Sequence, residues 1–167
     1  MPNWYVLHLK VNHENVAEKY LNGTAIENFI PRYSVKSRRK DRNRALVKRP
    51  LFPGYVFVRL NLQSENKTKT LRSPGAVKFV GFEASSASVV PDKVVESLKI
   101  LVQDGSAVKP HPYLDAGRRV NIIDGPFRGA SGFLDRKGRK NRLVVTLELL
   151  GRSVSVPVEE EDVELAD

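Results

Sequence analysis

The 167-residue sequence contains no cysteine. This absence excludes disulfide bonds, cysteine nucleophiles and cysteine-based zinc sites, and it is consistent with a cytoplasmic location. No apolar run is long enough to cross a membrane, and the N-terminus lacks the basic segment and apolar stretch of a secretory signal. We therefore expect a cytoplasmic protein without a membrane partner, and a monomer, because no heptad pattern is present.

Residues that could carry catalysis are also scarce. The three histidines, His8, His13 and His111, do not have the spacing of metal ligands. The glycine-rich stretch at residues 125–132 lacks the ending of a phosphate-binding loop, and the acids at 159–162 are consecutive, as in a solvated strand end. The sequence therefore predicts no enzyme, no metal site and no cofactor.

Positive charge is concentrated in the first part of the chain. The net charge is +9, and residues 1–103 hold 18 Lys and Arg against 8 Asp and Glu. Residues 32–49 alone contain nine basic residues and one acid. This asymmetry favours a polyanionic partner such as nucleic acid, although a solvated loop kept soluble by its charge would have the same composition.

Apolar periodicity in residues 1–103 predicts an α+β fold, with an antiparallel sheet flanked by helices. The basic run at 36–49 lacks a period and is expected to be a loop or the tip of a long hairpin. Strands are expected at residues 4–11, 26–35, 55–62 and 77–82, and helices at 13–21, 64–71 and 92–102.

The pattern changes after residue 103. Residues 104–115 are rich in turn and breaker residues and are expected to be a flexible linker. Short β-rich runs at 119–123, 132–135, 142–149 and 154–158 alternate with glycine-containing turns, which favours a small β-barrel over residues 116–167. The expected domains are therefore 1–103 and 116–167.

Aromatic residues cluster around the turn at residues 51–54. They are Phe52, Tyr55 and Phe57, with Phe79 and Phe82 further along the chain. Phe57 and Phe79 could equally belong to the core. Phe52 precedes a Pro-Gly pair in a turn, where a large ring is harder to bury, so we expect it to be exposed. An exposed aromatic patch rimmed by charge is typical of a protein-binding surface.

Two sets of motifs resemble the NusG family. Residues 4–7 (WYVL), 48–58 (KRPLFPGYVFV), 74–81 (PGAVKFVG) and 90–92 (VPD) are similar to its N-terminal domain. Residues 117–163 resemble its KOW domain, through 120–127 (VNIIDGPF) and 149–152 (LLGR). The KOW motif residues are Gly125, Pro126, Phe127 and Gly132.

The resemblance implies a transcription elongation and antitermination factor that binds RNA polymerase, suppresses pausing and increases processivity. In the family, an aromatic pocket docks onto the clamp helices of the largest polymerase subunit and the domain reaches the gate loop. By matching position the pocket would comprise Phe52, Tyr55, Phe57, Phe79 and Phe82, and Asn66, Lys67 and Thr68 would face the gate loop. Upstream or non-template DNA would meet Lys10, Lys36, Arg38, Arg39, Lys40, Arg42 and Arg44.

The chain most resembles the operon-specific RfaH-type members of the family, because it is short and carries the basic loop. The family's KOW domain contacts a small-subunit ribosomal protein or the Rho factor. Residues 128–131 (RGAS) lack the large apolar residue common in housekeeping members, which argues against Rho. The β-branched alternation at 142–149 favours strands over a helical resting state.

A second hypothesis remains open. KOW domains also occur in ribosomal proteins, and the basic run at residues 136–140 would suit phosphate contacts at a hairpin tip. The chain would then be a ribosome-associated or free RNA-binding protein.

Overall fold

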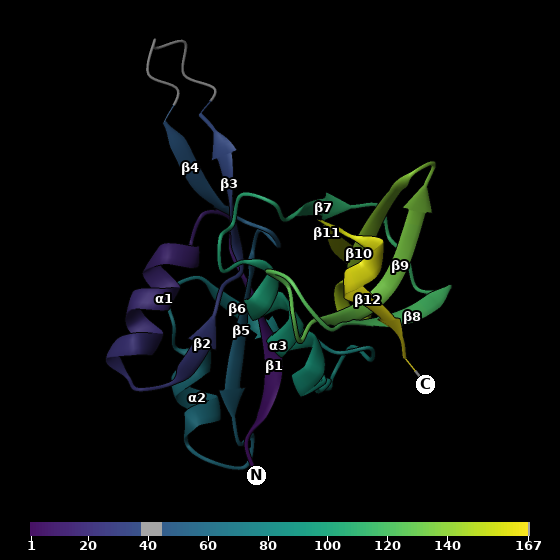
Figure 1. Cartoon of the computed structure of the whole chain (residues 1–167). Helices are drawn as coiled ribbons and strands as arrows, with labels where there is room; N and C mark the ends of the chain where they lie inside the picture. Colours follow the sequence, from purple (N-terminus) through teal and green to yellow (C-terminus); the bar gives the residue numbers. More distant parts are fainter. Residues whose placement is uncertain (38–44, 167) are drawn as a thin grey trace. The chain divides into compact units, whose positions relative to one another are not determined.

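The computed structural model describes residues 1–37 and 45–166. The chain divides into two compact units (Figure 1). Unit 1 comprises residues 1–30 and 52–92, and unit 2 comprises residues 31–51 and 93–167. No helix among the described residues is long and apolar enough to cross a membrane.

Unit 1 contains a four-stranded antiparallel sheet in the order β2-β5-β1-β6. Two helices accompany these strands in unit 1. The strands are β1 (Asn3–Leu9), β2 (Glu27–Phe29), β5 (Tyr55–Leu60) and β6 (Ala76–Phe79), and the helices are α1 (Glu14–Gly23) and α2 (Asn66–Leu71).

One face of this sheet forms the core of unit 1. Alternate residues of β1 and β5, including Leu7 and Val56, point to the same side and are fully buried. Helix α1 contributes Ala17 and Leu21 to the same core. Each large apolar side chain buried here contributes about 1.5–3 kcal/mol. Strand β1 ends at Leu9, two residues before the expected end, and residues 4–7 are all buried, so both of its faces are covered.

Unit 2 contains a two-stranded hairpin, a six-stranded antiparallel sheet and most of a helix. The sheet order is β12-β8-β9-β10-β11-β7. The elements are β3 (Arg32–Lys36), β4 (Leu46–Pro50), α3 (Asp92–Leu101), β7 (Lys109–His111), β8 (Arg118–Ile122), β9 (Ser131–Lys137), β10 (Lys140–Leu147), β11 (Arg152–Val158) and β12 (Val163–Leu165), with 3₁₀ turns at Glu148–Leu150 and Glu160–Asp162.

The alternation predicted for β10 holds only in part, because Val144, on the face opposite Leu143 and Val145, is also buried. Leu143, Val145 and Leu147 are buried, and the first two lie opposite Val156 and Val154 of β11. The strands expected in the second part of the chain are confirmed. The closure of these strands into a barrel stays a prediction.

Strand β7 is an element that the sequence did not predict. It lies in residues 104–115, the expected linker, and pairs antiparallel with β11 through Lys109 and His111. Its three residues include a proline and are too few to carry a recognisable period. The expected division at residues 103 and 116 stays a prediction.

Candidate functional site

The face of the unit 1 sheet opposite the α1 core carries a group of aromatic side chains. Residues paired in register share a face, so Val6, Phe57 and Phe29 lie together, as do His8 and Tyr55. The Phe29 and Phe57 ring centroids are 5.9 Å apart, and the His8 ring stacks on Tyr55 at 5.2 Å. Both distances are typical of favourable ring contacts.

Phe52 joins this group through the turn that precedes β5. Its ring packs edge-to-face on Phe57, with centroids 6.2 Å apart. The expectation that Phe52 is exposed is wrong, because only 2% of its surface is accessible. The turn places the ring on the sheet instead of in solvent. We name Phe52, Tyr55, Phe57, Phe29 and His8 the aromatic group.

Strand β1 and helix α1 hold the turn in place. Gly54 adopts φ +84°, a left-handed conformation that suits glycine. Its carbonyl oxygen accepts a hydrogen bond from the Leu9 amide at 2.7 Å, and its own amide donates to Glu14 Oε1 at 2.8 Å. Glu14 is a buried carboxylate, and a hydrogen bond to a charged acceptor is among the stronger kinds.

The five predicted clamp-binding residues do not form one cluster. Phe57 is 1% exposed and belongs to the buried part of its unit, whereas Tyr55 is half-buried. Phe79 lies opposite Leu7 in register and packs edge-to-face on Tyr5, on the α1 side of the sheet. Phe82 follows β6 in a loop and is 69% exposed. Phe79 and Phe82 therefore stand apart from the aromatic group.

The predicted gate-loop residues lie at the start of α2. Lys67 and Thr68 are exposed and Asn66 is half-buried. The backbone amide of Asn66 donates a hydrogen bond to Ser64 Oγ at 3.2 Å. The hydroxyl of Thr70 is buried and donates to the Asn66 carbonyl oxygen. Helix α2 therefore presents two polar side chains to solvent in unit 1.

Two of the predicted nucleic-acid contacts are described, and both are exposed. Lys10 follows β1, and Lys36 ends β3. Lys48 and Arg49 of β4, which pairs with β3, are also exposed. Arg38, Arg39, Lys40, Arg42 and Arg44 lie outside the described residues.

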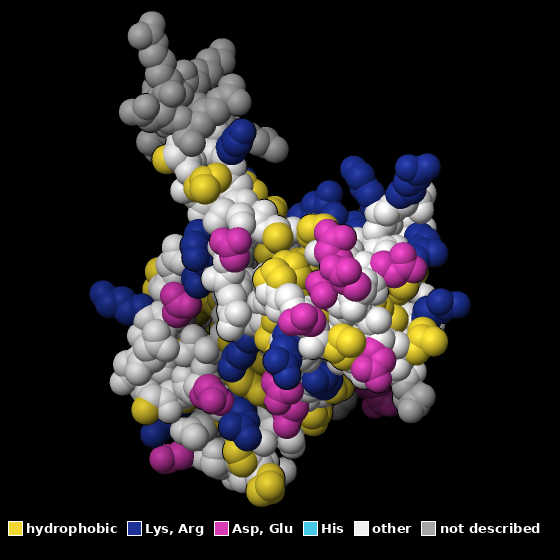
Figure 2. Space-filling model, viewed as in Figure 1, with side chains coloured by type: hydrophobic (Ala, Val, Ile, Leu, Met, Phe, Trp, Pro, Cys, Tyr) yellow, Lys and Arg dark blue, Asp and Glu magenta, His cyan; other side chains and the backbone are white. Residues whose placement is uncertain are grey.

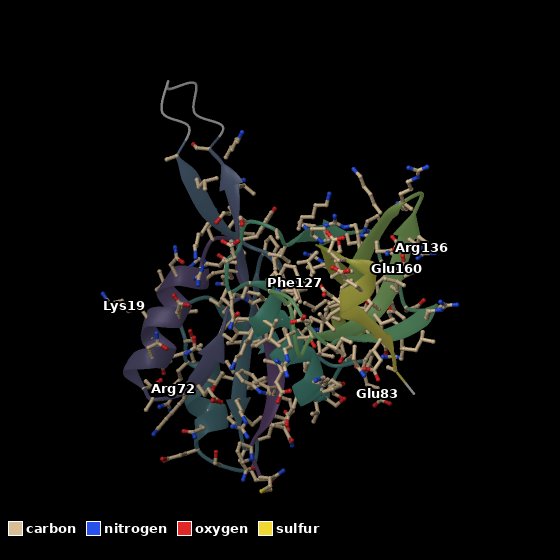
Figure 3. The ribbon with its side chains drawn as sticks, viewed as in Figure 1. Lys19, Arg72, Glu83, Phe127, Arg136 and Glu160 are labelled. Atoms are coloured by element: carbon tan, nitrogen blue, oxygen red, sulfur yellow. The ribbon has the colours of Figure 1, made fainter. Side chains whose placement is uncertain are left out.

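The KOW motif residues lie between β8 and β9 and at the start of β9. Gly125 and Pro126 are exposed in the turn, and Phe127 is half-buried (Figure 3). Gly132 approaches the neighbouring strand closely, because a Cβ there would lie 2.2 Å from the Val144 carbonyl oxygen. The pairing of β9 with β10 therefore requires glycine at this position.

A buried polar pair links β7 to β9 in unit 2. His111 Nε2 lies 3.0 Å from Asp135 Oδ2, with 8% and 22% of the two side chains exposed. Burial lowers the pKa of His111 below its ordinary value, outweighing the opposing effect of Asp135, and the charges of Arg142 and Lys137 lower it further. At neutral pH the uncharged imidazole therefore donates a hydrogen bond to the carboxylate.

Comparison with known proteins identifies the family. The sequence model described as "Transcription termination factor nusG" matches residues 2–99, more than half of the chain. The chain belongs to the NusG family. It is therefore related to transcription factors and not to enzymes.

Similarity to NusG proteins extends over nearly the full chain. The NusG of Staphylococcus epidermidis is 30% identical over 96% of this chain and 94% of its own. The NusG proteins of Bacillus subtilis and Pseudomonas aeruginosa are 28% and 27% identical over similar spans. All three are named transcription termination/antitermination proteins.

A solved structure supports the fold. The structure described as "Domain interaction in Thermotoga maritima NusG" matches with a TM-score of 0.54 and 24% identity, covering 100% of this chain and 98% of that one. The mixed fold of antiparallel sheets with few helices, expected from the sequence, is thereby confirmed. The described residues contain no group of His, Asp and Glu that could hold a metal ion.

Sequence reasoning missed several residues of the site. Phe29 and His8 join the aromatic group because they lie opposite Phe57 and Tyr55, and alternation along β1 could have placed His8 on that face. Glu14 gave no such signal, because its partner is a backbone amide 40 residues away. The His111–Asp135 pair could not be predicted either, because its two residues are distant in the sequence.

Proposed function

We propose that this NusG-family protein binds RNA polymerase during elongation, suppresses pausing and increases processivity. The observation that carries the proposal is the aromatic group, in which the rings of Phe52 and Phe57 are buried and Tyr55, stacked on His8, is half-buried. The clamp helices of the largest polymerase subunit are the proposed partner, and the gate loop would meet Asn66, Lys67 and Thr68. A few aromatic anchors can dominate such an interface, each contributing about 2 kcal/mol or more.

The basic β3–β4 hairpin and Lys10 are the proposed contacts with upstream or non-template DNA. Lys36, Lys48 and Arg49 are exposed on the hairpin and can reach phosphates. Phosphate contacts of this kind are sequence-tolerant and weaken steeply as salt rises. The interaction would take place in the cytoplasm, and the KOW-like part of the chain is the proposed contact with a small-subunit ribosomal protein.

Co-purification with the host's core RNA polymerase tests the clamp contact. Wild-type protein and a Tyr55→Ala variant are compared, because Tyr55 is accessible and its loss spares the buried rings. We expect Tyr55→Ala to reduce polymerase retention at least about tenfold. Circular dichroism should show that the variant is folded, with a modest fall in its unfolding temperature because the stack on His8 is lost.

A Tyr113→Ala variant is the matched control. Tyr113 is also accessible but belongs to unit 2, so its removal should leave retention at the wild-type level. Equal retention of wild type and a folded Tyr55→Ala variant would contradict the proposed clamp surface.

A further inference from the structure

The β9–β10 hairpin ends in a run of cations without acids. Residues 136–142 read RKGRKNR, which is five basic residues in seven. Lys137, Arg139 and Lys140 are exposed. In Figure 2, dark blue side chains gather around the end of this hairpin, at the upper right.

The pairing register sorts these cations onto two faces. Lys137 lies opposite Lys140, and Arg142 lies opposite Asp135 one pleat further along, so these four side chains share a face. Arg136 lies on the other face, where it binds Glu160 at 2.9 Å and Asn141 at 3.0 Å (Figure 3). Lys137, Lys140 and Arg142 therefore form a row, which we call the cationic row.

The neighbouring acid, Asp135, lies opposite Arg142 and offsets part of the charge of that guanidinium. Asp135 accepts the hydrogen bond from His111, and among the described residues no carboxylate forms a salt bridge with Lys137 or Lys140. Lys109 of β7 extends the positive face, because it pairs with Ser155 and Arg142 donates to Ser155 Oγ at 2.9 Å.

Burial lowers the pKa of His111 against the opposing effect of Asp135, and the charges of Arg142 and Lys137 on this face lower it further. Unscreened cations on one face attract a polyanion, whose binding releases counterions. The row contains only three cations at the end of one hairpin, so it matches a few consecutive phosphates of one strand better than the two backbones of a duplex.

We propose that the cationic row of β9–β10 binds the phosphodiester backbone of single-stranded nucleic acid. This contact lies in unit 2, is separate from the β3–β4 hairpin and does not depend on polymerase binding. Residues 136–142 contain no aromatic side chain on which a base could stack, so binding is independent of sequence. RNA and DNA single strands share the phosphates that the row recognises.

The test uses the full chain, free of polymerase, and fluorescent single-stranded RNA, single-stranded DNA and duplex DNA of equal length. The variant Lys137→Gln/Lys140→Gln removes two charges from the row. The control Lys19→Gln/Arg72→Gln removes two charges from exposed positions in unit 1 (Figure 3). Binding is measured by anisotropy across a salt series.

We expect the row variant to bind both single strands about tenfold more weakly at 0.1 M salt. The slope of the logarithm of its binding constant against the logarithm of salt concentration should become less steep by about 1.4. The control should match wild type. A loss confined to RNA or to DNA supports the site and identifies the strand. Equal affinities and slopes for the row variant and the control overturn the proposal, as does duplex binding that is tighter and equally sensitive.

Photo-cross-linking with 4-thiouridine RNA and wild-type protein keeps the proposal testable if the variant does not fold. Cross-links to the peptide containing residues 136–142 are expected, together with those to the β3–β4 hairpin. Cross-links confined to residues 32–50 would overturn it.

Discussion

His111 is a buried imidazole held by one carboxylate within a positive environment. Its neighbours are Asp135, which accepts its hydrogen bond, and the cations Arg142 and Lys137. Burial dominates, so the pKa in the folded protein lies below the ordinary value of 6.5. The stability of the contact between β7 and β9 at His111 therefore depends on pH.

Acidification should weaken this attachment. Below about pH 6.5 the unfolded chain binds a proton at this histidine more readily than the folded chain, so stability falls as pH decreases through that window. Urea unfolding at pH 7.5 and pH 5.5 should show a larger loss for wild type than for His111→Gln. Equal losses for the two proteins would contradict this role.

Gly132 illustrates a second residue-level constraint. A Gly132→Ala change would bring a methyl group against the Val144 carbonyl oxygen and force β9 away from β10. We expect a destabilisation of about 1–3 kcal/mol in denaturant unfolding. Gly23→Ala is the control, because nothing lies within 4 Å of its added Cβ. Its unfolding free energy should change by about 0.5 kcal/mol or less.

At the scale of elements, the aromatic group depends on how α1 and β1 hold the turn before β5. The Glu14 side chain accepts a hydrogen bond from the Gly54 amide, and this bond positions the turn that carries Phe52. Among the predicted elements, α1, α2, α3 and most strands are confirmed, because amphipathic periods mark them. The single strand expected at residues 26–35 is wrong, because the chain forms β2 and β3 on either side of Pro31, in two different sheets. Strand β7 escaped prediction because its pairing with β11 comes entirely from tertiary structure.

Removing the carboxylate should loosen the turn. Glu14→Ala leaves the half-buried Gly54 amide without its acceptor, and we expect a loss of about 1–3 kcal/mol in unfolding free energy. Polymerase retention should fall as well, because the turn orients Phe52. Glu14→Gln keeps an oxygen acceptor and should lose less. An alanine variant as stable as wild type would show that the bond does not hold the turn.

For the whole molecule, membership of the NusG family leaves open how widely the protein acts in the genome. We propose an operon-specific factor, on the basis of the basic hairpin, where Lys36, Lys48 and Arg49 are exposed. Chromatin immunoprecipitation with sequencing should then find the protein at a few long operons. A signal that follows RNA polymerase across most transcribed genes would instead establish a general factor.

The sequence by itself determined the family, the α+β class and most helices and strands, because apolar periods and turn residues act locally. It also indicated the basic hairpin and the aromatic residues that surround the turn. Tertiary structure decided which residues meet. It buried Phe52 on Phe57, separated Phe79 and Phe82 from that group, and paired His111 with Asp135. These contacts depend on strand register and on partners distant in the chain, and local sequence patterns do not specify either one.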